Sequence, residues 1–399
     1  MTPGRPRLHG LIAAAALVLT APLVAQDSAV ARPAAASAPG IPWSASYFPF
    51  ISKAVNDGPL LGIVYDYRQP ADYFDRVAFT RALRVRALLG SSGTYGGSVS
   101  FEAPRLADGW RLRTAASGYH ESRLKYYGLG PASPHLASIA SVSGPTLPDQ
   151  DDPLFRVTRT RFDFHAEVTR RIVGPLGVAL GTGIEHARFT PDSKEAASLF
   201  RQEVGSELDQ TDYTARLTVV VDTRDREYDT HAGFLGEAGL LGGTGGDGYG
   251  RWHVIASGYV PVAAATTVAA RVGAANAWGH PPLEARYLLH AWERPIMLLG
   301  GEQSHRGLAN GRSLGTGQLF ANLEVRQDIL VLGDLGAIGV LAFADGGRVF
   351  EGDFSLSFNR WKLAAGGGLM IRLLRSYITT LNFAGGQGFQ FTMTSGWFF

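Results

Sequence analysis

The chain has 399 residues, a formal net charge of +2 and no Cys, and only 18% of its residues are charged. The near-neutral charge argues against a nucleic-acid-binding or polybasic membrane-surface protein, and the lack of Cys excludes thiol catalysis, disulfides and thiolate metal sites. Although 45% of the residues are hydrophobic, no apolar run after the N-terminal segment approaches the roughly 20 residues of a transmembrane helix. Low charge combined with 50 Gly and 11% aromatic residues is typical of a β-barrel with one apolar and one polar face.

The N-terminus has the pattern of a cleaved secretory signal peptide. Arg5 and Arg7 precede an apolar stretch at 11–24, and small residues follow it. We expect residues 1–25, or 1–31, to be removed on export. Residues 26–58, which begin rich in Ala, Pro and Ser, are expected to form a flexible periplasmic leader. Residues 59–399 would then form the barrel.

The segments that follow alternate between an apolar and a polar face. From Phe389 to Phe399, one set of alternate positions is mainly apolar and aromatic and the other is mainly small or polar. Because successive side chains of a strand point to opposite faces, such a segment can face lipid on one side and a wet lumen on the other. The same pattern in 317–330 predicts that Glu324, Arg326 and Asp328 point inward. Charges confined to alternate positions in several strands are hard to reconcile with a soluble β-sandwich.

About sixteen strands are expected, an even number, as in single-chain bacterial barrels. The first and last strands would close against each other, because hydrocarbon does not tolerate an unpaired sheet edge. Longer connections near 129–154, 190–210 and 298–316 would lie outside, with tight turns toward the periplasm. The expected strands are 60–68, 77–90, 94–103, 109–120, 155–170, 176–189, 211–222, 232–241, 250–259, 266–277, 286–297, 317–330, 337–345, 361–373, 376–384 and 389–398.

No segment has the spacing of a catalytic, cofactor or metal site. The His residues are scattered, and neither Gly-x-Ser-x-Gly nor His-Glu-x-x-His occurs. The Gly-rich segment 242–248 lacks the Lys of a phosphate-binding loop and fits a hairpin connection. We therefore expect no catalytic residues, no cofactor and no metal, and an outer-membrane hydrolase is the least favoured function.

Three separated motifs stand out: Gly300–Leu308 in a long connection, Asn322–Arg326 in the strand after it, and Phe343–Gly347 at the end of another strand. Together they resemble motifs of the BamA/TamA superfamily of outer-membrane assembly and translocation barrels, also called the bacterial surface antigen family. That family carries an Arg-Gly-aromatic loop that folds back into the lumen, where its Arg meets inward-facing acids, one of them in a Phe-x-Asp-x-Gly motif. The resemblance implies a structural loop lock in which Arg306 and Gly307 meet Glu324 and a Phe343–Gly347 motif containing Asp345. Leu308 departs from the pattern, which usually has Tyr or Phe there.

Other segments support the resemblance, which covers about residues 45–399. Tyr126–Gly130 resembles an aromatic-Gly-Leu-Gly strand end, and Val221–Asp225 resembles a mid-barrel Asp-x-Arg-Asp turn. The terminal Trp397 and Phe399 resemble the C-terminal insertion signal of the family, although Thr394 stands where Gly is common. Within the loop motif, His305 has no family counterpart, and replacing it is expected to matter little.

The resemblance implies an outer-membrane protein that assists insertion, assembly or translocation of protein or lipid, and not an enzyme. Between the cleavage site and the first expected strand there is no room for a POTRA domain or a lipase domain, so a barrel-only member is expected. Its expected partners are outer-membrane lipid, the barrel assembly machinery during its own insertion, and a protein or lipid client, but no nucleic acid. The alternative is a passive pore or a structural surface protein, as lumenal charges such as Arg216 and Lys362 would allow.

Overall fold

The computed structural model describes residues 42–53, 59–72, 75–130, 155–191, 198–301, 303–373, 377–386, 388–395 and 399. All of them belong to the compact unit that spans residues 41–399. The predicted signal peptide therefore lies outside the described residues.

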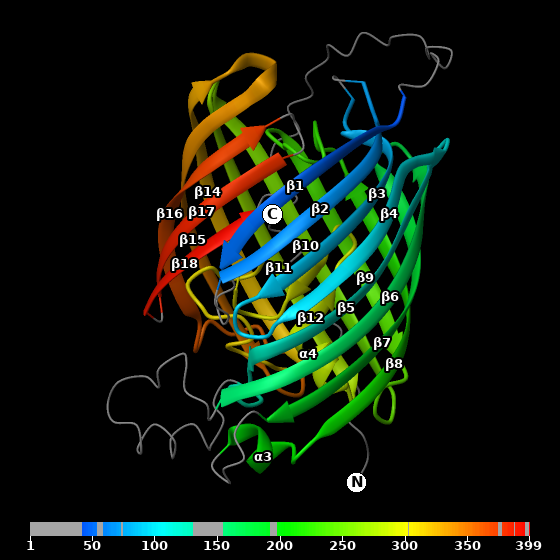
Figure 1. The fold of residues 1–399 in the computed structure, drawn as a ribbon, viewed down its shortest axis with the longest axis vertical. Helices are drawn as coiled ribbons and strands as arrows, with labels where there is room; N and C mark the ends of the chain where they lie inside the picture. The colour runs from blue at the N-terminus through cyan, green and yellow to red at the C-terminus, as the bar shows by residue number, and fades with distance from the viewer. Residues whose placement is uncertain are drawn as a thin grey trace. The chain divides into compact units, whose positions relative to one another are not determined.

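Sixteen strands form one antiparallel sheet, arranged in chain order and curled into a barrel (Figure 1). A separate two-stranded sheet, β12 and β13, and two five-residue α-helices complete the regular structure of the described residues. Among those residues, no helix is long and apolar enough to cross a membrane. The wall strands are β1 (Ser44–Lys53), β2 (Pro59–Pro70), β3 (Phe79–Gly90), β4 (Tyr95–Ala107), β5 (Trp110–Lys125), β6 (Arg156–Val173), β7 (Leu176–Pro191), β8 (Leu208–Asp222), β9 (Gly233–Gly243), β10 (Tyr249–Ala263), β11 (Thr266–Gly279), β14 (Gly317–Val331), β15 (Gly336–Phe350), β16 (Lys362–Leu373), β17 (Tyr377–Gly386) and β18 (Gly388–Ser395). The other elements are α3 (Leu199–Glu203), α4 (Leu283–Tyr287), β12 (Leu288–His290), β13 (Pro295–Met297) and a 3₁₀ turn at Gly333–Leu335.

The two faces of the wall differ as the alternation predicts. On β14, Leu323 and Val325 are exposed on the outer face, whereas Glu324 and Arg326 are buried on the inner face. On β16, the outward Leu363 is 72% exposed. Since a pleated strand presents alternate residues to opposite faces, the wall has an apolar exterior and a polar lumen. The prediction of a β-barrel is confirmed.

The connections between strands fall into two groups, one at each end of the barrel. Because the strands alternate in direction, the strand ends that are joined by the long connections 126–155, 192–207, 280–316 and 351–361 all lie at one end, which we call the loop end. Most of the connection expected near 129–154 lies outside the described residues. The other end, the turn end, includes the short turns 108–109, 174–175 and 264–265. In bacterial barrels the short turns are periplasmic and the longer loops face outside. We therefore orient the loop end toward the cell exterior and the turn end toward the periplasm.

Two differences from the predicted strands offset each other in the count of sixteen. β1 lies within the segment 26–58 that was expected to be a leader, so the barrel begins at Ser44 and not at residue 59. The predicted strand 286–297 is wrong as a wall strand, because that segment contains the β12–β13 hairpin and lies in the connection between β11 and β14.

The first and last strands do not close the sheet by main-chain pairing. β1 and β18 stand at the two ends of the hydrogen-bonding order, so the expected pairing between them is absent from the described residues. Side chains bridge part of this seam instead. The Phe48 and Tyr377 rings lie 4.2 Å apart, and the Ser46 and Tyr377 hydroxyls are 3.2 Å apart. β1 therefore contacts β17, the strand before the last.

The last residue lies inside the barrel. Phe399 is 4% exposed, and its main-chain oxygen accepts a hydrogen bond of 2.9 Å from Arg326. Its ring lies 4.9 Å from the Arg271 guanidinium and 6.4 Å from the ring of the lumenal Tyr259. The prediction that Phe399 continues the lipid-facing side of the last strand is therefore wrong, and β18 itself is described only as far as Ser395. Trp397 lies outside the described residues.

Candidate functional site

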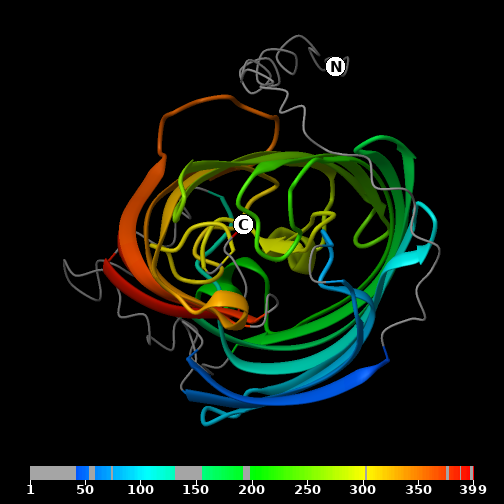
Figure 2. The same cartoon turned by 90° about the horizontal axis from the view of Figure 1, so that it is seen from above.

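The connection between β11 and β14, residues 280–316, occupies the lumen, and we call it the lumenal loop. Seen from above, its yellow trace lies within the ring of strands (Figure 2). Leu289, Leu299 and Leu308 of the loop pack with Phe320 and Val349 of the wall in one buried cluster. Leu308 is 1% exposed, so the aliphatic side chain that replaces the family's aromatic residue still fills the lumen.

Arg306 is the central polar contact of the lumenal loop, and it is 1% exposed. Its Nε and Nη2 atoms each donate to a different carboxylate oxygen of Asp345, both at 2.9 Å, and its Nη1 donates to Glu324. The main-chain N–H of Arg306 also donates to Asp345, at 2.9 Å. This is the planar, two-pronged geometry that Arg offers and Lys does not. Burial opposes the charge, but Glu324 and Asp345 outweigh it and raise the pKa of Arg306.

Neighbouring wall residues orient this pair. The Arg306 guanidinium lies 3.5 Å from the centre of the Phe343 ring. Asn322 donates to Asp345 at 3.0 Å and also to the Ser304 carbonyl at 3.0 Å, while Arg326 donates to Glu324 at 2.6 Å. Two acids and two arginines thus balance in charge, as a buried ionic cluster requires.

Gly307 lies against the wall at a point where no side chain fits. A Cβ atom at this position would lie 2.2 Å from the Cβ of Ala364 on β16 and 3.3 Å from the carbonyl oxygen of Gly385 on β17. Gly307 is not among the glycines with positive φ. The glycine is therefore needed for the close approach of the loop to the wall and not for a left-handed backbone conformation.

His305 is more constrained than its sequence context indicated. It is completely buried, and its Nε2 atom lies 3.0 Å from the main-chain oxygen of Lys362 on β16. Burial lowers the pKa of His305, so the neutral ring donates to that carbonyl. The expectation that replacing His305 matters little is revised, because its ring forms a further hydrogen bond between the lumenal loop and the wall, next to Arg306.

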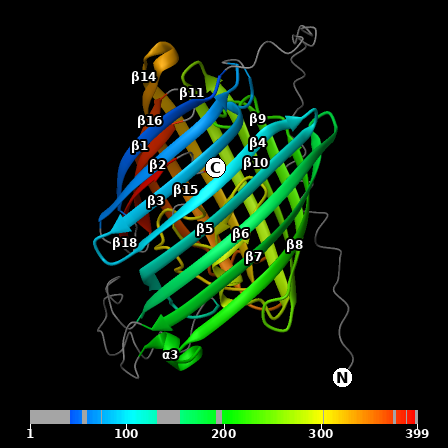
Figure 3. The same cartoon turned by 45° about the vertical axis from the view of Figure 1, so that its right-hand side comes forward.

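A second anchor holds the lumenal loop near the turn end, and sequence analysis missed it. Trp292 is 5% exposed, its main-chain N–H donates to Glu237 at 3.0 Å, and its indole N–H donates to Thr169 at 3.0 Å. Arg113 of β5 donates to the Trp292 carbonyl and stacks over its ring at 4.5 Å. Three different strands, β5, β6 and β9 (labelled in Figure 3), therefore fix this one residue.

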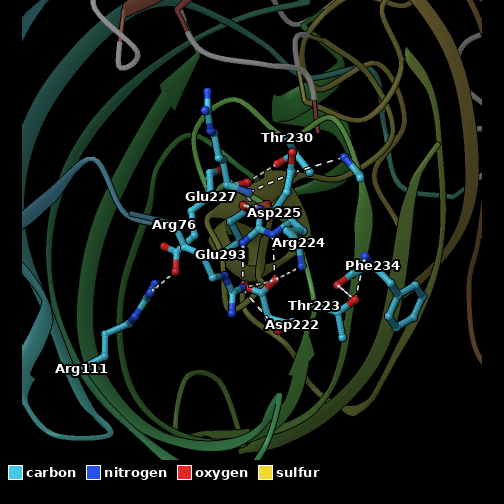
Figure 4. Close-up of polar contacts among 12 residues, drawn as sticks. Arg76, Arg111, Asp222, Thr223, Arg224, Asp225, Glu227, Thr230, Phe234 and Glu293 are labelled. Carbon is cyan, nitrogen blue, oxygen red and sulfur yellow. Dashed lines mark hydrogen bonds and ion pairs between the residues drawn. The ribbon is translucent and has the colours of Figure 1, made fainter. Parts of the chain in front are cut away.

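The next residue, Glu293, joins the loop to the turn between β8 and β9. Figure 4 shows Arg224 between Glu293 and Asp222. Its guanidinium donates two hydrogen bonds of 3.1 Å to the Asp222 carboxylate and a further one to Glu293. Arg111 of β5 pairs with Glu227 of the same turn (Figure 4). The Asp-x-Arg-Asp segment singled out in the sequence is thus the receptor for the far end of the lumenal loop. The loop enters at the loop end and makes contacts as far as the turn end.

Glu293 gives this anchor a dependence on pH. Burial raises its pKa, but Arg224 and Arg294 outweigh burial and lower the pKa of Glu293 from its ordinary 4.5 to about 2. A lowered pKa contributes stability that is present above pH 4.5 and is lost as pH falls toward 2. Glu293→Gln should therefore reduce the fall in unfolding temperature between pH 4.5 and 2, measured by thermal unfolding in detergent micelles. An acid-induced fall as steep in the variant as in the wild type would contradict this pairing.

A third anchor lies near the loop end. Glu284 of α4 is 2% exposed and accepts two hydrogen bonds of 3.0 Å from Arg159 of β6. Arg251 of β10 donates to the Leu288 carbonyl at 2.8 Å. Charged groups of two separate strands, β6 and β10, therefore hold the lumenal loop here, and neither belongs to the Arg306 cluster.

The described residues provide no metal-binding group of three or more His, Cys, Asp and Glu side chains. The arginines of the clusters above are paired with carboxylates or main-chain carbonyls, and their chemistry is that of positioning. Together these contacts hold one long loop inside the lumen at three depths.

The comparisons with known proteins agree with this geometry. The model of the Omp85 superfamily domain matches residues 81–384. The chain belongs to the Omp85 superfamily. It is accordingly an integral β-barrel protein of the outer membrane, and the predicted relation to BamA-type barrels is confirmed. The matched range contains Arg306, Gly307, Glu324, Phe343 and Asp345.

Solved structures of this superfamily share the fold. BamA from Haemophilus ducreyi lacking POTRA domains 1–3 superposes with a TM-score of 0.54 at 14% identity, over 90% of this chain and 70% of that one. CdiB from Escherichia coli gives a TM-score of 0.54 at 14% identity, over 90% of this chain and 63% of that one. This Omp85 chain thus spans less than two thirds of the length of that CdiB. Comparison with curated protein sequences gave no match.

Proposed function

We propose that this Omp85 barrel assists the insertion, assembly or translocation of protein or lipid at the outer membrane, using its seam and its plugged lumen. The family and the fold support a role of this broad kind. The finer assignment depends on the lumenal loop, which Arg306, Glu293 and Glu284 tie to the wall at three levels. We propose no enzymatic activity.

The seam between β1 and β18 is the second element of the proposal. The main-chain donors and acceptors along the facing edges of these strands are not joined in a ladder. An open strand edge is a template for pairing with another strand. In this proposal the plug keeps the lumen closed to solutes while the seam receives the client, and Arg306 with Gly307, Glu324, Phe343 and Asp345 acts as the loop lock.

Three further parts of the proposal concern the export of the chain, its insertion into the membrane and its partners. Residues 1–25, or 1–31, are removed as a signal peptide. The C-terminal segment with Trp397 and Phe399 is the insertion signal, read by the assembly machinery before the barrel folds. Its final partners are outer-membrane lipid and a protein or lipid client.

A deletion strain tests the function. We expect the abundance of at least one outer-membrane protein or lipid component to fall when the gene is removed, and to recover when wild-type protein is supplied. The control variant Arg188→Ala removes an exposed arginine that pairs with Glu207 and is not part of the loop lock. It should restore the missing component as well as the wild type does. Arg306→Ala should not. An unchanged outer membrane in the deletion strain would refute the proposal.

The competing function is a passive pore, and the filled lumen argues against it. An open pore predicts a large steady conductance of the purified protein in planar bilayers. A lumen occupied by residues 280–316 predicts a small and fluctuating conductance.

A further inference from the structure

The connection between β15 and β16, residues 351–361, leaves the barrel mouth and crosses its rim. At its start, Glu351 pairs with Arg286 of the lumenal loop at 3.0 Å. One residue later, the Gly352 carbonyl accepts a hydrogen bond of 3.2 Å from Asn276. Asn276 belongs to the outward set of β11, which also includes the exposed Val272 and Trp278. The backbone therefore passes from the lumenal side to the outer side within two residues.

Beyond the rim, the connection lies against the outer face of the wall. The ring of Phe354 is 5.0 Å from that of Trp252 and 5.8 Å from that of Phe350. Trp252 stands on the outward face of β10, between the inward Arg251 and His253. Phe354 has therefore reached a strand three positions away from β15 in the sheet order. Figure 2 shows the orange connection outside the ring of strands.

Beyond Phe354, two large apolar side chains of this connection are exposed. Phe354, Leu356 and Phe358 alternate with serines, and Leu356 and Phe358 are 57% and 87% exposed. The Phe358 ring lies 5.6 Å from that of Trp361, the residue immediately before β16. Large apolar side chains that are exposed close together form a patch of the kind that marks a membrane or partner contact, and the lipid-facing wall adjoins this one.

We propose that residues 351–361 form an outer flap that lies in the lipid of the outer leaflet, with Leu356 and Phe358 among the acyl chains. The apolar side of the flap continues the lipid-facing wall, which is the established membrane contact of this barrel. Aromatic side chains gather where a barrel meets the membrane interface. Residues 351–361 therefore belong to the membrane-embedded surface and not to the water-exposed loops.

An arginine marks the polar boundary of the flap. Arg348 of β15 donates to the Ser357 carbonyl at 2.9 Å, and its guanidinium lies 5.5 Å from the Phe350 ring. An outward guanidinium at the rim suits a lipid phosphate, since arginine near the interface attracts such headgroups. Lipid thus accounts for both the apolar side chains and this cation.

The absence of Cys makes the test direct, because a single introduced Cys is the only thiol in the chain. Phe358→Cys would be labelled with an environment-sensitive dye in the full-length protein, reconstituted in phosphatidylcholine vesicles. Quenching by brominated acyl chains would be divided by quenching by aqueous iodide. Two reference variants bracket the scale. Leu323→Cys lies on the lipid face of β14, and Asp108→Cys lies in a turn where the side chain is fully exposed.

We expect the ratio at position 358 to be several-fold above that at position 108 and close to that at position 323. Arg348→Gln should move the ratio at 358 toward the value at 108, because the flap loses its contact with the phosphate. A ratio at 358 that is closer to the turn reference than to the wall reference would overturn the proposal. Leu356→Cys, on the same side of the flap, provides the same measurement if Phe358→Cys does not fold. The outcome is independent of the proposed function, which does not use the flap.

Discussion

Replacing Arg306 by Ala should lower the free energy of unfolding of the barrel by about 3–5 kcal/mol, the usual effect of removing one partner from a buried ion pair. In the variant, Asp345 loses the two hydrogen bonds from the Arg306 guanidinium. Glu324 keeps its hydrogen bond from Arg326. Both carboxylates are almost completely buried, so water does not replace the lost guanidinium. Heat-modifiability in gel-shift assays measures the temperature at which the barrel unfolds.

Two control variants separate the lock from charge in general. Arg188→Ala removes an arginine that is paired with Glu207 but half exposed, and such surface pairs contribute about 0–1 kcal/mol. Arg306→Lys keeps the charge but not the fork, so it should recover only part of the loss. An unfolding temperature for Arg306→Ala equal to that of Arg188→Ala would exclude a stabilising role for the cluster.

Introducing one methyl group at Gly307 should be nearly as damaging. In Gly307→Ala the new Cβ would lie 2.2 Å from the Cβ of Ala364, far inside van der Waals contact. Neither atom is at the end of a flexible side chain, so the backbone of the lumenal loop must shift. Overpacking of this kind costs about 1–3 kcal/mol, and here it also displaces Arg306, the preceding residue. The unfolding temperature in the gel-shift assay should therefore fall markedly.

A second-site change identifies the clash as the cause. Ala364→Gly removes the opposing methyl group, so the double variant should be more stable than Gly307→Ala alone. Ala364→Gly in the wild-type background should show only the modest loss expected of a glycine within a strand. Failure of the double variant to recover would show that Gly307 is required for its backbone conformation and not for space.

The alternation of polar and apolar residues determined most of the wall in advance. In strands such as β14 and β16, charged residues fall on one parity because the outer face meets lipid and the inner face meets polar groups. This contrast persists along the strand, so it can be seen in one sequence. It also placed Glu324 correctly on the lumenal side.

Two segments were misassigned for identifiable reasons. The segment at 44–53 was assigned to the leader because it follows an Ala-, Pro- and Ser-rich stretch. The strand that it forms contains Pro49, which is tolerated because β1 is an edge strand, with one row of main-chain groups outside the ladder. The segment at 286–297 was read as wall because a plug inside a filled lumen is as apolar as a strand. Periodicity does not distinguish a buried hairpin from a membrane strand.

The candidate site shows where a single sequence stops being informative. The Arg306 cluster was expected because its motifs resemble those of a known family. The pairing of Glu293 with Arg224, 69 residues apart, has no local signature, since the order of contacts across a lumen depends on how the loop folds. Trp292 gave one signal in retrospect, because a Trp followed by two charged residues in a long connection needs partners that water alone does not provide.

The anchors of the lumenal loop also distribute stiffness unevenly around the ring. The hydrogen bonds and ion pairs described above end on β5, β6, β8, β9, β10 and β14–β16, so these strands are cross-braced through the centre of the barrel. β1, β2 and β3 lie at the first end of the sheet order, and none of the loop contacts described above ends on them. A lateral load on the barrel would therefore bend the margin that begins with β1, while the braced strands keep their curvature.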